Sequence, residues 1–341
     1  MNGSPEAGAS PVGGIVWEQR WHPLREEWVV SGPFSAASPG GGGEAPARPR
    51  PPRYDAACPL CPGNERPGGR NPDYTGVLVF QERLPPGRDR DAARDPLYRS
   101  RSARGTVEVV CHHPDHSASF AELSDFDVLA VVETWAERCA ELGRRRHIED
   151  VLVLERCTPA QGAHPHSRLY AVELVHALTQ RELEAARRYQ RATGGLLGEA
   201  VLERELASGR TVTGNEHFAA SVPWFARRAC EVLVLPRAPA AGLGDLDSER
   251  RLALATLLRE VAIRYENLWR GRVPYLMSVH QAPRTREDVS CYPFHVELLP
   301  GLERPGDARG GPAEPLSGSG SPDEDAAALR AVPARLRREP S

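Results

Sequence analysis

Hydrophobic residues recur along most of the chain at spacings that predict alternating strands and helices. Between residues 124 and 146, apolar side chains return every three or four positions, the period of an amphipathic helix that Ser124 can cap. A second long helix is predicted from Asp247 to about residue 269, and Gly194-Gly195 interrupts a third helical stretch between residues 180 and 206. Short apolar runs predict strands at residues 16–30, 106–111, 151–155, 169–175, 210–213, 218–223, 231–236, 274–280 and 293–299.

The order of these predicted elements is repeated once along the chain. Strands and a long helix occur within residues 16–178, and the same kinds of element return within residues 179–301. We therefore expect an α+β fold of two tandem halves, each a mainly antiparallel sheet with helices packed on one side. Residues 1–15 and 302–341 are rich in Gly, Pro, Ser and charge and predict loose segments, apart from a short helix at residues 325–331.

Composition narrows the classes of function. The chain has 341 residues and a net charge of −3, which does not favour a nucleic-acid partner. No apolar run approaches the roughly 18 residues of a membrane span, and no signal-peptide pattern is evident. All 43 basic residues are arginine, so Schiff-base chemistry on lysine is excluded. Seven cysteines without a regular framework predict a reducing compartment, and we expect a cytoplasmic protein.

Two short motifs carry candidate chemistry. In His164-Pro165-His166, two imidazoles flank a proline between predicted strands, and neutral imidazole is both a nucleophile and a metal ligand. The thiol pair of Cys58-Pro59-Leu60-Cys61 is typical of half a zinc site or of a redox pair. His116 and His164 are the candidates that would complete a Cys2His2 zinc site. Each motif alone also fits a plainer explanation, a His-rich loop or buried thiols.

Taken in order, the motifs resemble those of the galactose-1-phosphate uridylyltransferase family of the histidine-triad superfamily. The resemblance extends from about residue 16 to residue 300, and it implies two histidine-triad-like halves that form one open half-barrel. The stretches that carry it are Trp28-Val29-Val30, Cys58 to Asn64, Asn71 to Gly76, Val79-Phe80, Pro114 to Ser117, the H-P-H motif, Glu216-His217-Phe218, Val222-Pro223-Trp224, residues 231–236, Ser278 to Pro283 and Phe294 to Glu297.

The resemblance also implies residue roles. In the family, the second histidine of H-P-H attacks the α-phosphorus of UDP-glucose, glucose 1-phosphate leaves, and galactose 1-phosphate then takes the uridylyl group. By position, the nucleophile is His166. The implied structural zinc ligands are Cys58, Cys61, His116 and His164. The implied ligands of a second metal, iron or zinc, are Glu182, His280, His295 and Glu297, the last in place of a histidine common in the family. The expected partners are a nucleotide sugar, a sugar phosphate and a second copy of the chain.

Several expected ligand contacts depart from the family pattern. Ser167-Arg168 stands where the motif continues Gly-Gln, and Glu82-Arg83 where the family has Asn-Asp. Ser35 and Ser38 stand where the family has two arginines on a phosphate-binding loop. The expected substrate-binding residues are Arg168, Ser167, Arg156, Glu82 and Arg83, whose arginines could replace the positive charge missing at the two serines.

Three hypotheses follow from these departures. The protein is a nucleotidyltransferase of altered specificity, a phosphorylase or hydrolase that passes the nucleotidyl group to phosphate or water, or a binder that has lost turnover. We favour a working, specialised transferase, because His166 and the proposed zinc ligands are present while the changes fall at ligand contacts.

Overall fold

A nine-stranded sheet forms the centre of the molecule, with strand order β5-β6-β8-β7-β12-β13-β11-β10-β9. The structure is a computed structural model that describes residues 18–31, 50–82, 104–157, 164–285, 287–301, 316–317 and 321–337. Every neighbouring pair of strands in this sheet is antiparallel. Its strands are β5 (Leu78–Glu82), β6 (Gly105–Cys111), β7 (Asp150–Cys157), β8 (His166–Val172), β9 (Thr211–Gly214), β10 (Phe218–Ser221), β11 (Val232–Pro236), β12 (Tyr275–His280) and β13 (His295–Pro300).

The two halves of the chain meet edge to edge within this sheet. Strands β5 to β8 come from the first half, strands β9 to β13 from the second, and β7 pairs with β12 at the junction, from Tyr275 opposite Cys157 to Val279 opposite Val153. The outer strands β5 and β9 do not pair with each other, so the sheet stays open. The predicted α+β fold with two halves in one open half-barrel is confirmed.

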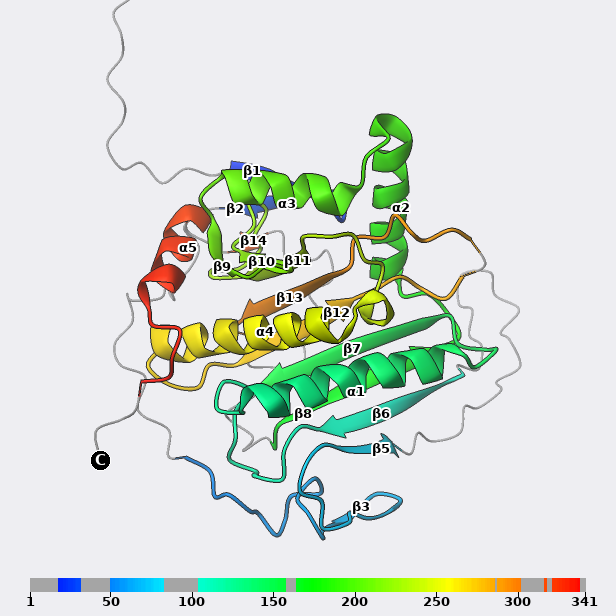
Figure 1. The fold of residues 1–341 in the computed structure, drawn as a ribbon, viewed down its shortest axis with the longest axis vertical. Helices are drawn as coiled ribbons and strands as arrows, with labels where there is room; N and C mark the ends of the chain where they lie inside the picture. Colours follow the sequence, from blue (N-terminus) through cyan, green and yellow to red (C-terminus); the bar gives the residue numbers. More distant parts are fainter. Residues whose placement is uncertain are drawn as a thin grey trace, which may run out of the picture.

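Two long helices lie side by side across one face of the sheet (Figure 1). They are α1 (Asp125–Gly143) and α4 (Ser248–Leu268), and their first turns are capped by Ser124 and Asp247 as the sequence predicts. The apolar stripe of α1 is buried, with Val131 and Trp135 fully enclosed. This helix-covered face therefore contains the main hydrophobic core, which is shared by both halves.

The opposite face is covered, over the second half, by two further helices and a hairpin. These are α2 (Ala177–Thr193), α3 (Leu197–Ala207) and the hairpin of β1 (Glu18–His22) and β2 (Glu27–Ser31). Leu233 and Leu235 of β11 point into this smaller core with Leu183 and Leu197, while Val232 and Val234 point into the main core. The second half is thus packed on both faces.

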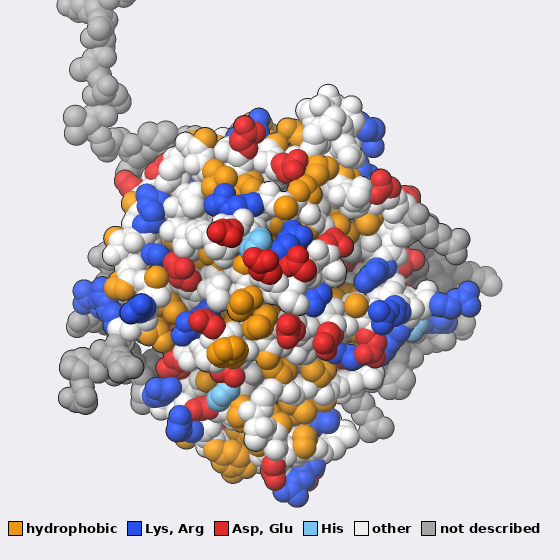
Figure 2. Space-filling view, viewed as in Figure 1, with side chains coloured by type: hydrophobic (Ala, Val, Ile, Leu, Met, Phe, Trp, Pro, Cys, Tyr) orange, Lys and Arg blue, Asp and Glu red, His pale blue; other side chains and the backbone are white. Residues whose placement is uncertain are grey.

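Smaller elements complete the described structure. A short hairpin of β3 (Glu65–Arg66) and β4 (Gly69–Arg70) follows the Cys58–Cys61 turn, and β14 (Leu316–Ser317) runs parallel to β2. The short helix expected at residues 325–331 is present as α5 (Pro322–Ala331) and buries Ala326 and Leu329 in the main core. None of the described helices is long and apolar enough to cross a membrane. Figure 2 shows acidic and basic side chains interspersed over the face that α1 and α4 cover.

Two predicted strands differ from the structure. The run at residues 16–30 is a hairpin that turns at residues 23–26, and β8 occupies residues 166–172 instead of 169–175. The polar Ser167 and Arg168 do not belong to an apolar run, yet β6 and β7 pair with them on both sides and hold them extended. Consequently the H-P-H motif ends inside a strand and not in a loop.

A buried carboxylic acid in the main core gives a stability prediction. Glu155 on β7 accepts a hydrogen bond from the Tyr275 hydroxyl at 3.1 Å, and its Oε2 is buried without a partner among the described residues. Burial raises the pKa of Glu155 from 4.5 to about 8. The folded protein therefore holds a proton that the unfolded chain releases, so wild-type stability should fall as the pH rises through this interval.

We expect Glu155→Gln to remove this pH dependence. The variant should match wild type near pH 4.5 and exceed its free energy of unfolding by about 2–4 kcal/mol above pH 8. Urea unfolding at both pH values measures the difference, and Glu149→Gln, at an exposed carboxylate, is the matched control. A Glu155→Gln effect that is the same at both pH values would contradict the assignment.

Candidate active site and metal centres

The candidate nucleophile lies at the first position of β8. His166 pairs with Cys111 of β6, and side chains alternate along the strand, so His166, Arg168 and Tyr170 share one face. Ser167, Leu169 and Ala171 point the other way and are buried under α1. The candidate active site is therefore on the face opposite to α1 and α4.

One hydrogen bond sets the tautomer of His166. Its Nδ1 lies 2.8 Å from the carbonyl oxygen of His164. A carbonyl oxygen can only accept, so Nδ1 carries the proton and Nε2 presents its lone pair. Burial lowers the pKa of His166 below its ordinary value, against the opposing effect of the His164 carbonyl, and the Arg168 cation lowers it further. The ring is therefore held in its neutral, nucleophilic form.

Arg168 lies directly beside this lone pair. Its Nη1 is 3.2 Å from Nε2 of His166, and its Nε donates to the Glu82 carboxylate at 3.3 Å. Both charged side chains are about 40% exposed, so a ligand can reach them. Sequence reasoning placed Arg168 and Glu82 among the ligand contacts, and the structure brings them together next to His166.

Ser167 was expected among the substrate-binding residues but lies on the opposite face of the strand. Its hydroxyl accepts from Trp135 Nε1 at 2.7 Å and lies 3.1 Å from Nε2 of His112. Burial holds the pKa of His112 well below its ordinary value, so this imidazole is neutral. Ser167 thus anchors β8 to α1 and is not oriented toward a ligand, because strand side chains alternate.

The other expected ligand contacts have different outcomes. Arg156 lies on β7, where it pairs with Leu276 of β12, on the same face of the sheet as His166. Arg83, Ser35 and Ser38 lie outside the described residues.

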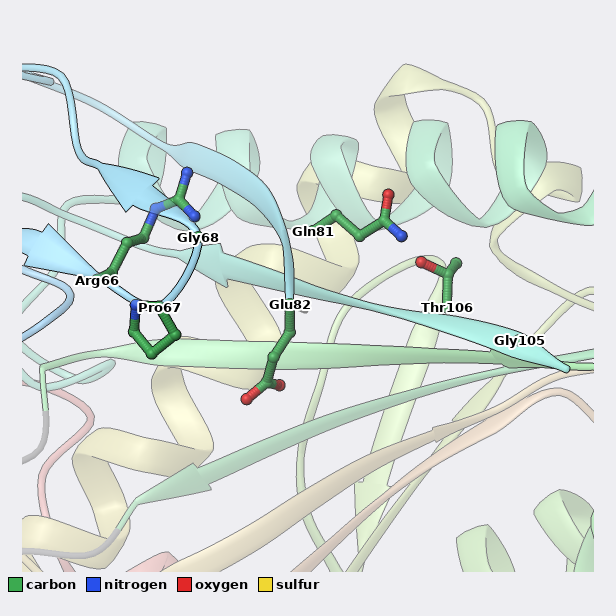
Figure 3. Close-up of a pocket in the computed structure, with 7 residues that line it drawn as sticks. All are labelled: Arg66, Pro67, Gly68, Gln81, Glu82, Gly105 and Thr106. Atoms are coloured by element: carbon green, nitrogen blue, oxygen red, sulfur yellow. The ribbon is translucent and has the colours of Figure 1, made fainter. Parts of the chain in front are cut away.

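A cavity of about 460 Å³ opens beside Glu82 at the edge of the sheet. Figure 3 shows its lining: Gln81 and Glu82 from the end of β5, Gly105 and Thr106 from the start of β6, and Arg66, Pro67 and Gly68 from the β3–β4 hairpin. The volume is in the range of small-molecule sites. Glu82 lines this cavity and also accepts a hydrogen bond from Arg168, whereas His166 itself does not line it.

Four side chains gather at the proposed zinc site. The ligand atoms of Cys58, Cys61, His116 and His164 all lie within 4.8 Å of one another. The Cys61 sulfur is 3.6 Å from Nδ1 of both histidines. Burial is the main reason that the pKa of His164 falls to about 3, so this ring is a neutral ligand. The donor set fits a closed, tetrahedral metal site.

A second layer of hydrogen bonds holds these ligands. Tyr74 donates to the carbonyl of Leu60 at 2.6 Å and lies 2.7 Å from Nε2 of His164, so it must accept from that ring. Nε2 of His164 therefore carries the proton, and Nδ1 faces the thiols. Asn71 donates to the carbonyls of Pro59 and Cys61, each at 2.9 Å. Tyr74 and Asn71 belong to the family motif in the sequence, but the motif alone does not predict that they hold the metal ligands in place.

The second proposed metal centre lies between α2 and the sheet. Glu182, His280 and His295 bring their ligand atoms within 4.8 Å of one another and are all buried. The two imidazoles stack with centroids 4.4 Å apart. Tyr292 donates to Glu182 Oε2 at 2.5 Å, while Glu182 Oε1 and His295 Nε2 are buried without a hydrogen-bond partner among the described residues. Two unpaired acceptors on adjacent ligands fit a cation.

Glu297 lies beside these three residues but outside the group whose ligand atoms come within 4.8 Å of one another. Its carboxylate oxygens are 3.4 Å from His280 Nε2 and 3.9 Å from His295 Nε2. Burial alone would raise the pKa of Glu297, but Arg227 and Arg25 hold it well below its ordinary value. The expected fourth ligand is thus engaged mainly by arginines.

The fold and the site together define a protein of two histidine-triad-like halves, with a candidate histidine nucleophile and two clusters of side chains that could hold metal ions. Comparison with known proteins narrows this class. The family model for the galactose-1-phosphate uridyl transferase N-terminal domain matches residues 14–176, and that for the C-terminal domain matches residues 182–306. The chain is 32% identical over 296 residues to the galactose-1-phosphate uridylyltransferase of Haemophilus influenzae, covering 84% of each.

Solved structures agree with this at the level of the fold. A uridylyltransferase structure aligns with a TM-score of 0.71 at 24% identity, covering 92% of this chain and 97% of that one. An Arabidopsis thaliana ADP-glucose phosphorylase with bound ADP-glucose aligns with a TM-score of 0.72 at 19% identity, covering 93% and 99%. The chain belongs to the galactose-1-phosphate uridylyltransferase family.

The geometry at Cys58 gives a prediction about metal and stability. Cys58→Ser removes one thiolate from the four-ligand set, so the variant should lose the bound metal and several degrees of melting temperature. Elemental analysis and a thermal melt of the same purified sample test both effects. Cys291→Ser, at a buried cysteine of the smaller core, should keep its metal. Wild-type protein that is well folded and free of metal would refute the site.

Proposed function

We propose that this protein transfers UMP from UDP-glucose to galactose 1-phosphate or a related sugar phosphate, with His166 as the nucleophile. The observation that carries the proposal is the His166 ring itself: its Nδ1 is committed to the His164 carbonyl at 2.8 Å, and its Nε2 lies beside an arginine on the accessible face. Family membership supports the same reaction.

The reaction would proceed in two successive displacements at phosphorus, both through His166. His166 Nε2 attacks the α-phosphorus of the nucleotide sugar, an N–P bond forms, and the bond from phosphorus to the sugar-phosphate oxygen breaks. Sugar 1-phosphate leaves and a uridylyl-histidine remains. A phosphate oxygen of the second sugar phosphate then attacks the same phosphorus, and the N–P bond breaks. The His164 carbonyl stabilises the cationic ring of the intermediate through the Nδ1 proton.

Arg168 would provide the positive charge for the transferred phosphoryl group. Before attack, its guanidinium must leave the Nε2 lone pair, and the α-phosphate oxygens are the partners that would draw it away. Glu82 limits this movement, because its carboxylate holds the guanidinium by Nε. The cavity beside Glu82 would take the remaining part of the donor.

The metal sites would act as structural supports. We propose zinc at Cys58, Cys61, His116 and His164, where it ties the Cys58–Cys61 turn to a residue two positions before the nucleophile. We also propose that the second metal is iron or zinc. The same proposal includes a cytoplasmic location and a homodimer. A zinc of this kind fixes the position of β8 and takes no part in the displacement.

Covalent catalysis is tested by the His166→Ala variant. Exchange of label between UDP-glucose and glucose 1-phosphate should fall at least ~10³-fold, because the attacking atom is gone. Intact mass spectrometry of wild type after incubation with UDP-glucose should show the added mass of UMP, and the variant should show none. His217→Ala, at a half-buried histidine paired with Glu249, is the matched control. Equal exchange by wild type and His166→Ala would overturn the role.

Arg168→Gln separates the hypotheses about specificity. If the pocket is built around Arg168, the variant should bind its nucleotide donor about 10-fold or more weakly, as the loss of a charged hydrogen bond would give. If UDP-glucose transfer instead increases, Arg168 impairs an ordinary uridylyltransferase. Calorimetry with UDP-glucose and with ADP-glucose, the ligand in the Arabidopsis relative, identifies the donor. Absence of binding and of adduct with every donor would favour a protein without turnover.

A further inference from the structure

The second half contains a copy of the strand arrangement that presents the nucleophile. Strands β6-β8-β7 in the first half correspond to β11-β13-β12 in the second, and α1 corresponds to α4. His166 begins β8, and His295 begins β13. His295 Nδ1 lies 2.6 Å from the carbonyl of Pro293, two residues earlier, just as His166 Nδ1 lies 2.8 Å from that of His164. The two imidazoles therefore have the same tautomer.

By this correspondence Glu297 stands in the second half where Arg168 stands in the first, two residues after the histidine. Arg168 is about 39% exposed and Glu297 about 3%. The second copy is closed by α2, which contributes Glu182, and by the β1–β2 turn, which contributes Arg25. The question is whether Glu297 binds a metal there or does something else.

The contacts of Glu297 are those of an ion-pair anchor. One Arg25 nitrogen, Nη2, donates to both carboxylate oxygens at 2.9 and 2.7 Å, and Arg227 Nη2 donates to Oε2 at 2.9 Å. Arg227 is itself fixed by Glu231, whose Oε1 accepts from its Nη2 at 2.8 Å. A metal ion bound to Glu297 would lie next to two guanidiniums in a site with little water, which Coulomb repulsion opposes.

Two of the other three residues have a ligand atom without a hydrogen bond. Glu182 Oε1 and His295 Nε2 are 3.8 Å apart, are buried, and have no hydrogen-bond partner among the described residues. Arg25 Nε lies 3.8 Å from Glu182 Oε1, beyond hydrogen-bond distance. His280 stacks on His295 and completes the group within 4.8 Å. Buried acceptors that face one another without a donor are costly unless a cation lies between them.

We infer that Glu297 is not a metal ligand but the anchor of an arginine clamp (Arg25, Glu297 and Arg227), and that Glu182, His280 and His295 alone hold the metal cation. The clamp joins three separate parts of the chain: the β1–β2 turn, β13 and the segment before β11. The inference concerns metal binding and stability, so it does not depend on the proposed transferase activity.

Metal content and melting temperature of the full chain, reconstituted with Zn²⁺ alone, test the inference. Wild type should hold about two zinc ions per chain and His280→Ala about one. Glu297→Gln should keep both zinc ions and melt about 5 °C lower, because it removes the carboxylate charge that Arg25 and Arg227 share. Glu231→Gln is the matched control: it removes the other carboxylate from Arg227 and should behave like Glu297→Gln.

Two outcomes would overturn the inference. The first is loss of one zinc ion from Glu297→Gln, as in His280→Ala, which would make Glu297 a ligand. The second is a wild type with about one zinc ion that His280→Ala leaves unchanged, which would mean that the arginines replace the metal altogether. If Glu297→Gln folds poorly, the double variant Arg25→Gln with Glu297→Gln removes a charge of each sign and is measured in its place. The zinc contents and melting temperatures are read independently of any nucleotide-transfer assay, so failure of the proposed function would not change them.

Discussion

The antiparallel pairing of β7 with β12 is the contact on which both candidate centres depend. It joins two four- and five-stranded halves into one sheet, from Tyr275 opposite Cys157 to Val279 opposite Val153. Strand β8, which begins with His166, pairs with β7 on one side of this junction, and β13 pairs with β12 on the other. Because α1 and α4 pack against each other across the junction, a shift of its register would displace His166 and His295 together.

Local patterns predicted the helices well and the site only partly. Ser124 and Asp247 cap their helices as expected, because capping and a 3.6-residue period are encoded within a few residues. The four proposed zinc ligands were predicted through family motifs, and the structure brings them together although His116 and His164 lie far from Cys61 in sequence. Arg25 and Glu297 are 272 positions apart in the sequence, and no local sequence pattern predicts their contact. Ser167 was expected to contact substrate but lies on the helix-covered face, because β8 already includes it and strand side chains alternate.

The comparison of the two halves shows how surroundings decide what an imidazole does. His166 and His295 share a tautomer set by a carbonyl two residues earlier. The first is half-buried and lies beside the partly exposed guanidinium of Arg168, so an anionic ligand can reach it. The second is fully enclosed beneath α2 and lies next to Glu182. An enclosed ring can bind a cation but cannot reach a nucleotide. The same backbone geometry therefore suits a structural role in the second half and a candidate catalytic role in the first.

Charge at the open site constrains the ligand in the same physical terms. A phosphate that approaches the neutral His166 ring is stabilised by nearby positive charge, and with no lysine in the chain arginine is the permanently charged side chain that can supply it. Arg168 is in contact with the ring, yet Glu82 cancels part of its charge at 3.3 Å. Under the proposed mechanism, a phosphate that takes Arg168 Nη1 away from His166 would gain a charged hydrogen bond and free the Nε2 lone pair. In the proposed mechanism, ligand binding and activation of His166 would therefore be coupled through Arg168, and a donor that does not contact Arg168 would leave the Nε2 lone pair of His166 covered.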